Sequence, residues 1–262
     1  MRRTAISALI LGAVAGLAAT PAAWAEESES AGQRLYQLRT YYTAPGKLDV
    51  LITRFREHNL PLFERHGITL VGAWTPPGKD EEDRLVYLVS FPGRSAADRA
   101  WKGFGNDPEW KDVFGKEKKD HGEVVTRGET VYLAPTDYSP NPGPKPARGG
   151  RRAFELRTYT ASPGKLNDLN KRFREHTMEL FKKHGMTNVL YTTPTEKEKG
   201  AGKDLVYLLA YPGREAADLS WRAFRDDPEW QRVSKESQPD GVPLAAKVVS
   251  AYLEPTDFSP LR

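Results

Sequence analysis

Apolar and polar residues follow one another along the chain in a pattern that predicts a short series of strands and helices. Residues 35–42 are aromatic or β-branched at alternating positions, which is typical of a strand. From 47 to 66 the apolar residues recur with the 3.6-residue period of an amphipathic helix, and Gly67 follows as the expected C-terminal glycine. Three later apolar segments predict further strands, at 68–74, 85–91 and 124–133.

More helix is predicted between the third and fourth strands. Ser95 and Asp98 form the S-x-x-D pattern of a helix start, and Asp107 followed by Pro108 begins a further short helix. The order of elements is therefore β-α-β-β-α-β, which is the order of a ferredoxin-like unit. Pro61 interrupts the helix at 47–66 and is expected to kink it.

The whole series occurs twice. The longest matches between the copies are 54–58 (Arg-Phe-Arg-Glu-His) with 172–176, 85–94 with 205–214, and 132–140 with 252–260. Glu179 replaces Pro61 in the second copy, whose helix is expected to be straighter. We therefore expect two domains, at 33–140 and 153–262, joined by a proline- and glycine-rich linker at 141–152.

One ferredoxin-like unit covers only one face of its sheet with helices, so we expect the α+β units to pack as a pseudo-symmetric α+β barrel. The first strand of each unit has two faces. The more apolar face is expected to contact the helices: Tyr36, Leu38 and Thr40, and in the second copy Phe154, Leu156 and Thr158. The amphipathic face is expected to line the barrel interior: Gln37, Arg39 and Tyr41, and in the second copy Glu155, Arg157 and Tyr159.

These paired motifs resemble the NIPSNAP family. The resemblance is carried in both copies, across most of 33–262, by an E/Q-L-R-T-Y strand, a P-G-K-L turn, an R-F-x-E-H helix and a closing H-G. It implies a fold of the dimeric α+β barrel group, in agreement with the strand order. That group includes haem-binding and cofactor-free oxygenases, decarboxylases and modules without known chemistry, and the family itself has no agreed catalytic residues. Fold alone therefore does not assign a function.

The N-terminus has the pattern of an export signal. Arg2 and Arg3 precede an apolar segment from Ala5 to Ala19, and Ala23-Trp24-Ala25 forms an A-x-A cleavage site. The apolar segment is shorter than the roughly 20 residues that a spanning helix needs. We therefore expect residues 1–25 to be a cleaved signal peptide and the mature protein, without a transmembrane segment, to be periplasmic or secreted.

Charge and cysteine content exclude several classes of function. Removal of Arg2 and Arg3 leaves 37 of the 39 basic residues against 35 acidic ones, without the basic excess of nucleic-acid-binding proteins. The absence of cysteine excludes disulfides, thiolate metal sites and a cysteine nucleophile. No pair of histidines has metal-ligand spacing on one helix face, so no metal site is predicted.

Arg39 with Tyr41, and Arg157 with Tyr159, are the first candidates for ligand contact. If both pairs line the barrel interior, two arginines and two phenols converge there and would suit a small anionic or aromatic ligand. In the alternative, a neighbouring acid such as Glu155 neutralises each arginine as a structural ion pair.

His58 and His176 are the second candidates, because they lie beside the apolar stripe of the duplicated helix. Each could act as an acid/base group or as a haem ligand, or be a locally hydrogen-bonded histidine at the edge of the core. The duplicated tryptophans, Trp101 with Trp221 and Trp110 with Trp230, are expected to pack in the core rather than to stack on a ligand.

Two hypotheses follow from these residues. The first is an exported tandem NIPSNAP-like barrel that binds a ligand or a partner, with a homo-oligomer as one arrangement. The second is a small-molecule enzyme, an oxygenase or isomerase, that uses the barrel cavity. Catalytic residues and cofactor stay unassigned, because almost every candidate residue is present in both copies.

Overall fold

The computed structural model describes residues 34–78, 82–142 and 152–262. Gln33–Arg262 forms one compact unit. The predicted signal peptide at 1–25 and most of the predicted linker at 141–152 lie outside the described residues. Within the described ranges, no helix has the length and apolar character needed to cross a membrane.

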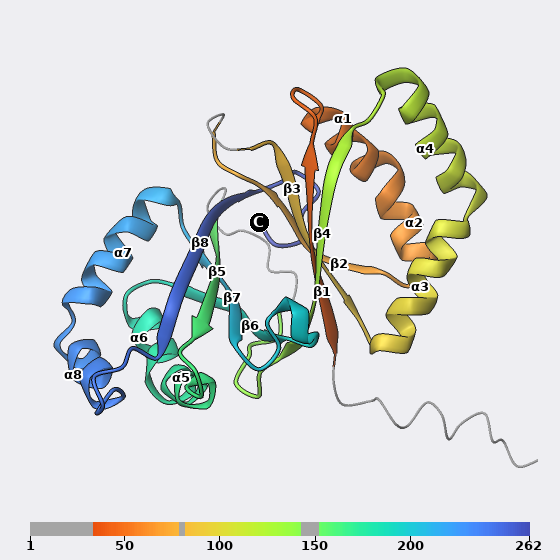
Figure 1. Ribbon diagram of the computed structural model, residues 1–262. Helices are drawn as coiled ribbons and strands as arrows, with labels where there is room; N and C mark the ends of the chain where they lie inside the picture. Colours follow the sequence, from red (N-terminus) through yellow and green to blue (C-terminus); the bar gives the residue numbers. More distant parts are fainter. Residues whose placement is uncertain (1–33, 79–81, 143–151) are drawn as a thin grey trace, which may run out of the picture. The chain divides into compact units, whose positions relative to one another are not determined.

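The first repeat contains four strands and a layer of helices (Figure 1). Its strands are β1 (Leu35–Thr43), β2 (Thr69–Thr75), β3 (Arg84–Phe91) and β4 (Val125–Pro135). Its helices are α1 (Leu48–Arg54), the π-helical turn η2 (Phe55–Asn59), α2 (Leu60–Arg65), α3 (Arg94–Asn106) and α4 (Pro108–His121). The predicted order of strands and helices is confirmed, and Asp107 caps α4 by accepting a hydrogen bond from the Glu109 amide.

The second repeat has the same order of elements. Its strands are β5 (Ala153–Ala161), β6 (Thr187–Pro194), β7 (Asp204–Tyr211) and β8 (Ala245–Pro255). Its helices are α5 (Leu166–Arg172), the π-helical turn η3 (Phe173–Thr177), α6 (Met178–Lys183), the 3₁₀ turn η4 (Lys197–Lys199), α7 (Arg214–Asp226) and α8 (Pro228–Glu236). The last helix is shorter than its counterpart α4, with 9 residues against 14.

The eight strands close into one barrel in the order β1-β3-β2-β8-β5-β7-β6-β4. Within each repeat the pairing is antiparallel and extensive, whereas the repeats meet through short pairings of β2 with β8 and of β4 with β6. The helices of the two repeats lie on opposite sides of the strands (Figure 1). The expected fold, two ferredoxin-like units packed as an α+β barrel, is confirmed.

The barrel interior is a packed apolar core. It contains Tyr36, Trp74 and Phe154 among leucines and valines from both repeats, and the rings of Trp74 and Phe154 lie 5.4 Å apart. Gly72 leaves room for the Trp74 ring, since a Cβ at this position would lie 2.2 Å from it. The remaining void of about 20 Å³ is lined by apolar side chains apart from Thr192 and Tyr207.

The expected facing of the first strands is therefore wrong in both repeats. The sets with Tyr36 and with Phe154 point into the barrel, and the sets with Arg39 and with Arg157 point to the helices, where each guanidinium lies over a helix tryptophan. The reason is access to water. The space between the two sheets is enclosed and its core is apolar, so a charged guanidinium would be costly to bury there, whereas the margin of the helix layer leaves these arginines partly exposed.

The duplicated helix contains a π turn in both repeats. The amide of Leu60 bonds the carbonyl of Phe55, and that of Met178 bonds the carbonyl of Phe173, five residues earlier in each case. The second repeat has this turn although Glu179 stands where the first has Pro61, so the two helices share one interruption instead of the expected difference. The π turn allows Arg54 and Phe55, which are adjacent in the chain, both to be buried.

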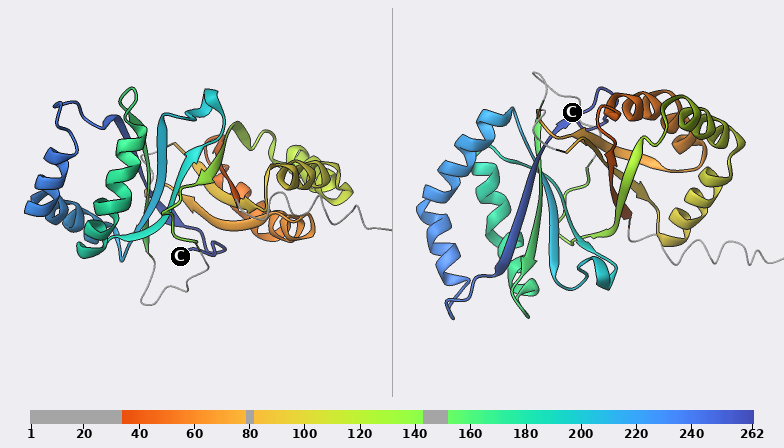
Figure 2. Two further views of the ribbon diagram at one scale, coloured as in Figure 1. Left: turned by 90° about the horizontal axis from the view of Figure 1, so that it is seen from below. Right: turned by 45° about the horizontal axis from the view of Figure 1, so that its top comes forward.

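The segment after the last strand of each repeat binds to the other repeat. We call Thr136–Pro140 the first tail and Thr256–Pro260 the second tail. Asp137 of the first tail pairs with Arg174, whose Nε and Nη2 atoms donate to its two carboxylate oxygens at 2.9 and 2.6 Å. Asp257 of the second tail pairs with Arg56 in the same way, at 2.8 and 3.0 Å. Figure 2 shows the C-terminus beside the first repeat.

Each tail also satisfies the backbone of a strand in the other repeat. The Ser259 hydroxyl accepts a hydrogen bond from the Ala73 amide at 3.0 Å, and the amide of Thr256 donates to the Ala73 carbonyl at 2.9 Å. Ser139 and Thr136 make the same two bonds to Tyr191, both at 2.9 Å. The tails thus continue the short β2–β8 and β4–β6 pairings that close the barrel.

His66 and His184 lie at the ends of the duplicated helices, and each bonds to the aspartate that caps the last helix of its repeat. The Nε2 atom of His66 lies 2.7 Å from Oδ2 of Asp107, and that of His184 lies 2.6 Å from Oδ2 of Asp227. The His66 hydrogen bond, with Arg65 and the Glu109 amide adding to it, lowers the pKa of Asp107 to about 2. These histidines therefore join two helices rather than cap free carbonyl groups.

We predict that Ser259→Ala destabilises the protein by about 1–3 kcal/mol, because the buried Ala73 amide loses its partner. Asp257→Ala should cause a much smaller loss, since exposed ion pairs contribute little. Urea unfolding of both variants and the wild type measures the difference. An equal or larger loss for Asp257→Ala would show that the tail is held by charge and not by its backbone bonds.

We also predict that part of the stability is lost as the pH falls from about 4 to about 2. The pKa of Asp107 is about 2 in the folded protein against an ordinary value of 3.8, so the charged carboxylate stabilises the fold above pH 4 and ceases to do so as it is protonated. The wild type should exceed Asp107→Asn in urea-unfolding midpoint at pH 6, with the gap narrowing towards pH 2. A gap that stays constant across this range contradicts the prediction.

Candidate functional site

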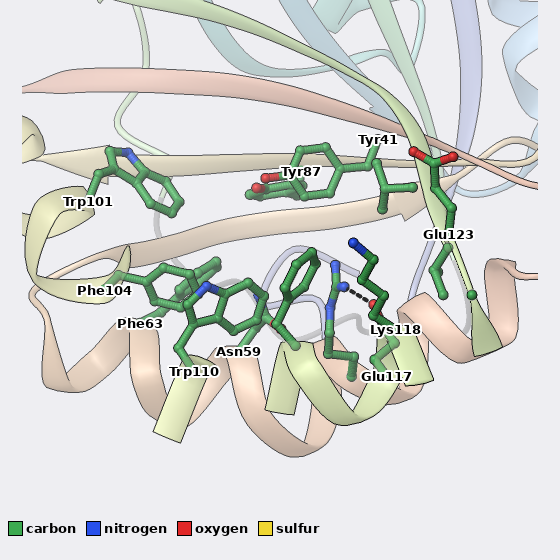
Figure 3. A pocket seen from close by; sticks show the side chains of 15 residues that line it. Tyr41, Asn59, Phe63, Tyr87, Trp101, Phe104, Trp110, Glu117, Lys118 and Glu123 are labelled. Carbon is green, nitrogen blue, oxygen red and sulfur yellow. Dashed lines mark hydrogen bonds and ion pairs between the residues drawn. The ribbon is translucent and has the colours of Figure 1, made fainter. Parts of the chain in front are cut away.

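A cavity of about 510 Å³ lies in the helix layer of the first repeat, between the helices and strands β1 and β3. Figure 3 shows its side chains. Seven of its fifteen lining residues are aromatic: Tyr41 and Tyr87 from the strands, and Phe63, Trp101, Phe104, Trp110 and Phe114 from the helices. Phe114, Lys118 and Glu123 are exposed, so the cavity opens to solvent between α4 and the start of β4.

Contacts between rings hold the aromatic wall. The Phe104 and Trp110 rings lie 4.6 Å apart, and Trp101 meets Phe104 edge-on at 5.7 Å. Tyr41 and Tyr87 meet edge-on at 5.3 Å, and in Figure 3 their hydroxyl groups lie on the side of the cavity that faces Trp101. Burial raises the pKa of Tyr87 well above its ordinary value, which keeps its phenol neutral and able to donate a hydrogen bond.

A buried ion pair forms the floor of the cavity. Arg54 and Glu117 are paired, with side chains only 6% and 8% exposed, and the Arg54 guanidinium carbon lies 5.4 Å from the Trp110 ring centre. Arg54 Nε and Glu117 Oε2 have no hydrogen-bond partner among the described residues. Such a pair is costly to bury unless the remaining polar atoms are satisfied.

The second repeat is built differently at the matched positions. Arg172 is the counterpart of Arg54 and donates to the Ser237 hydroxyl at 3.3 Å, where Ser237 is the counterpart of Glu117. Burial lowers the pKa of the Arg172 guanidinium. Thr177 donates to the Arg172 carbonyl at 3.2 Å, whereas the matched Asn59 leaves its buried Oδ1 without a partner in the described part of the chain. The repeats share a fold but differ in the polar groups of their helix layers.

Arg39 and Tyr41 lie together in the first helix layer. The Nη2 group of Arg39 donates to the Tyr41 hydroxyl at 2.8 Å, and the guanidinium carbon lies 4.4 Å from the Trp101 ring centre. Arg157 and Tyr159 occupy the matched place in the second layer, where Arg157 also pairs with Glu155. The expectation that the two pairs converge in the barrel is therefore wrong, because the closed barrel separates them. The alternative of a structural ion pair with Glu155 is confirmed for Arg157.

His58 and His176 lie apart from these residues. His58 is half-buried in a shallow depression shared with Glu57 and His121 between η2 and α4, and His176 lies in a depression between α5 and α8. The structure does not bring either histidine together with the arginine–tyrosine pair of its repeat in one cavity. Across the described ranges, no group of three histidine, aspartate or glutamate side chains is arranged as metal ligands.

Haem was a candidate cofactor for the barrel interior, and the residues there do not fit it. The void of about 20 Å³ is far smaller than a porphyrin, and its lining is almost entirely apolar side chains. All five histidines lie on, or at the ends of, helices outside the barrel. The alternative function, an enzyme that uses the barrel cavity, therefore loses its proposed site.

Of the residues predicted to contact a ligand, only Tyr41 lines the cavity, and the lining residues that were not predicted include Arg54, Asn59, Trp110 and Glu117. Arg54 stands directly before the apolar Phe55, and its recurrence as Arg172 was the available signal for a buried arginine. Its partner Glu117 is 63 residues away and belongs to a run of charges that reads as a solvated face. Trp110 was assigned to core packing because Trp230 matches it.

Comparisons with solved structures agree with the barrel. A protein proposed to be a monooxygenase, from Lactobacillus acidophilus, is 12% identical with a TM-score of 0.55, and the match covers 85% of this chain and 93% of that chain. A mutant chlorite dismutase from Candidatus Nitrospira defluvii is 10% identical with a TM-score of 0.52, covering 88% and 92%. At these identities the likeness shows the shared fold alone.

The family comparison covers both repeats. A NIPSNAP domain protein from Burkholderia xenovorans is 20% identical with a TM-score of 0.36, and the match covers 41% of this chain and 99% of that chain. No curated protein sequence matches. The NIPSNAP family model matches residues 36–140 and again residues 154–260. This chain therefore belongs to the NIPSNAP family and carries two NIPSNAP domains in tandem.

Proposed function

We propose that the protein binds a small aromatic or otherwise apolar molecule in the cavity of its first repeat. The observation that carries this proposal is a cavity of about 510 Å³ that is lined by seven aromatic side chains and bordered by several buried polar atoms without a hydrogen-bond partner among the described residues. Small-molecule sites are typically concave, of roughly 300–1,000 Å³, and mostly apolar with a few polar groups that orient the ligand.

The unpartnered atoms favour a ligand over a mere packing defect. Buried polar atoms are almost always hydrogen-bonded. Around this cavity Trp101 Nε1 offers a donor, and Asn59 Oδ1 and Glu117 Oε2 offer acceptors, none of them bonded within the described residues. A ligand with its own polar groups would satisfy these atoms while its apolar body contacts the rings.

The second repeat supports the same choice by contrast. It has an open depression of about 680 Å³ beside Arg157 and Trp221, but the polar groups there bond to one another. Trp221 Nε1, for example, donates to Glu155 at 2.7 Å, while the matched Trp101 Nε1 has no partner in the described ranges. The first repeat is therefore the proposed binding repeat and the second the proposed structural one.

Export is part of the proposal. It rests on the basic start, apolar segment and A-x-A site within residues 1–25. An exported binding protein would meet its ligand outside the cytoplasm, where the lack of cysteine makes the fold independent of disulfide formation.

We predict that Trp110→Leu weakens binding of the neutral probe 2-naphthylacetamide about tenfold or more, because it removes a ring from the cavity wall. The matched control is Trp230→Leu, whose ring packs on Phe224 at 4.4 Å just as Trp110 packs on Phe104 at 4.6 Å. The control should lose similar stability and keep the wild-type affinity.

Isothermal titration calorimetry measures the affinities, and circular dichroism checks that both variants are folded. Absence of probe binding to the wild type, or equal weakening by Trp110→Leu and Trp230→Leu, would refute binding in the first repeat.

We predict that the protein recovered from its native host begins at Glu26, because the A-x-A site ends at Ala25. Intact-mass measurement after cell fractionation tests this. Recovery of the full-length chain from the cytoplasmic fraction would contradict export.

A further inference from the structure

One buried position gives the helix layers of the two repeats different charges. In the second repeat it is Glu155 on β5, which is 1% exposed and pairs with Arg157. Its carboxylate also accepts hydrogen bonds from the Tyr211 hydroxyl at 2.6 Å and from Trp221 Nε1 at 2.7 Å, with the Ser250 hydroxyl as a further donor at 2.5 Å. A single internal carboxylate thus satisfies this arginine and its surroundings.

In the first repeat the same position holds Gln37, which is 2% exposed and uncharged. Among the described residues, its Oε1 accepts only a long hydrogen bond from Arg39, at 3.4 Å. Phe91 replaces Tyr211, and both Arg39 Nε and Trp101 Nε1 are buried without a partner in the described part of the chain. Arg39 forms no ion pair with any described carboxylate, so its positive charge is not neutralised from within.

This charge lies against the wall of the proposed binding cavity. The guanidinium carbon of Arg39 is 4.4 Å from the ring centre of Trp101, 5.4 Å from that of Tyr41 and 6.0 Å from that of Tyr87, and all three rings line the cavity. A half-buried guanidinium with a free N–H is best satisfied by a carboxylate, with which it forms charge-assisted hydrogen bonds.

We infer that the ligand of the first repeat carries a carboxylate that pairs with Arg39 beside Trp101, as Glu155 pairs with Arg157 beside Trp221. The inference rests on the proposed function and adds the chemical class of the ligand: an aromatic or apolar body joined to a carboxylate. The second repeat contains its own carboxylate, and the first takes one from outside.

The test compares two probes of the same shape, 2-naphthylacetate and the neutral 2-naphthylacetamide, by isothermal titration calorimetry at pH 7 with the mature protein. The wild type should bind the acid about 10- to 100-fold more tightly than the amide, which is the range expected for a hydrogen bond to a charged group. Equal affinities for acid and amide would overturn the carboxylate inference while leaving the proposed function intact. Failure of both probes to bind would count against the proposed function itself.

Gln37→Glu gives the first repeat the carboxylate of the second and should neutralise Arg39 from within. The variant should lose the preference for the acid and bind the amide as the wild type does. Arg39→Met removes the charge and keeps the aliphatic stem, and it should also abolish the preference, which decides the matter if Gln37→Glu disturbs folding.

Lys119→Met serves as the comparison, because Lys119 is an exposed cation on the same helix, α4, and does not line the cavity. It should leave the preference for the acid in place. A preference that survives Arg39→Met, or that disappears with Lys119→Met, would overturn the assignment to Arg39.

Discussion

The structure depends on one constraint: each four-stranded sheet is covered by helices on only one face. The other face has to be buried by the second sheet, so the two repeats form a closed barrel whose interior excludes water. Because the enclosed interior is apolar, the arginines of the first strands point to the helix layers instead. It also explains the tails, since Ser139 and Ser259 accept hydrogen bonds from strand amides beyond the end of the short strand pairings between the repeats.

The duplicated helix motif has a separate meaning for each of its residues. Phe55 and Phe173 are core residues, and Arg56 and Arg174 form exposed ion pairs with the tail of the opposite repeat. Arg54 is buried beneath the cavity, directly before the π turn that begins at Phe55. A motif that could have been taken for an active site thus mainly joins the repeats. The same helix nevertheless contributes Arg54 and Asn59 to the cavity. The second repeat has Thr177 in place of Asn59, and the Thr177 hydroxyl donates to the Arg172 carbonyl of its own helix.

The two repeats share a fold but differ in how their buried polar groups are satisfied. The clearest differences are Glu155 against Gln37 and Ser237 against Glu117, each of which changes the charge around a buried arginine. Closure of the barrel needs both repeats, whereas the proposed ligand site lies in the first repeat alone. This accounts for two copies that are nearly identical in their packing residues and different in their buried polar groups.

The amino-acid sequence by itself determined the repeats, the order of strands and helices, the family and the barrel, because periodicity and turn residues are local properties. The sequence also indicated the ion pair of Arg157, because Glu155 stands two residues before it. Three features were decided only by the tertiary structure: the facing of the first strands, the pairing of Arg54 with Glu117, and the cavity beside Trp101. Alternation separates the two faces of a strand but does not say which is enclosed. That depends on where the second sheet shuts out water and on contacts between residues far apart in the chain.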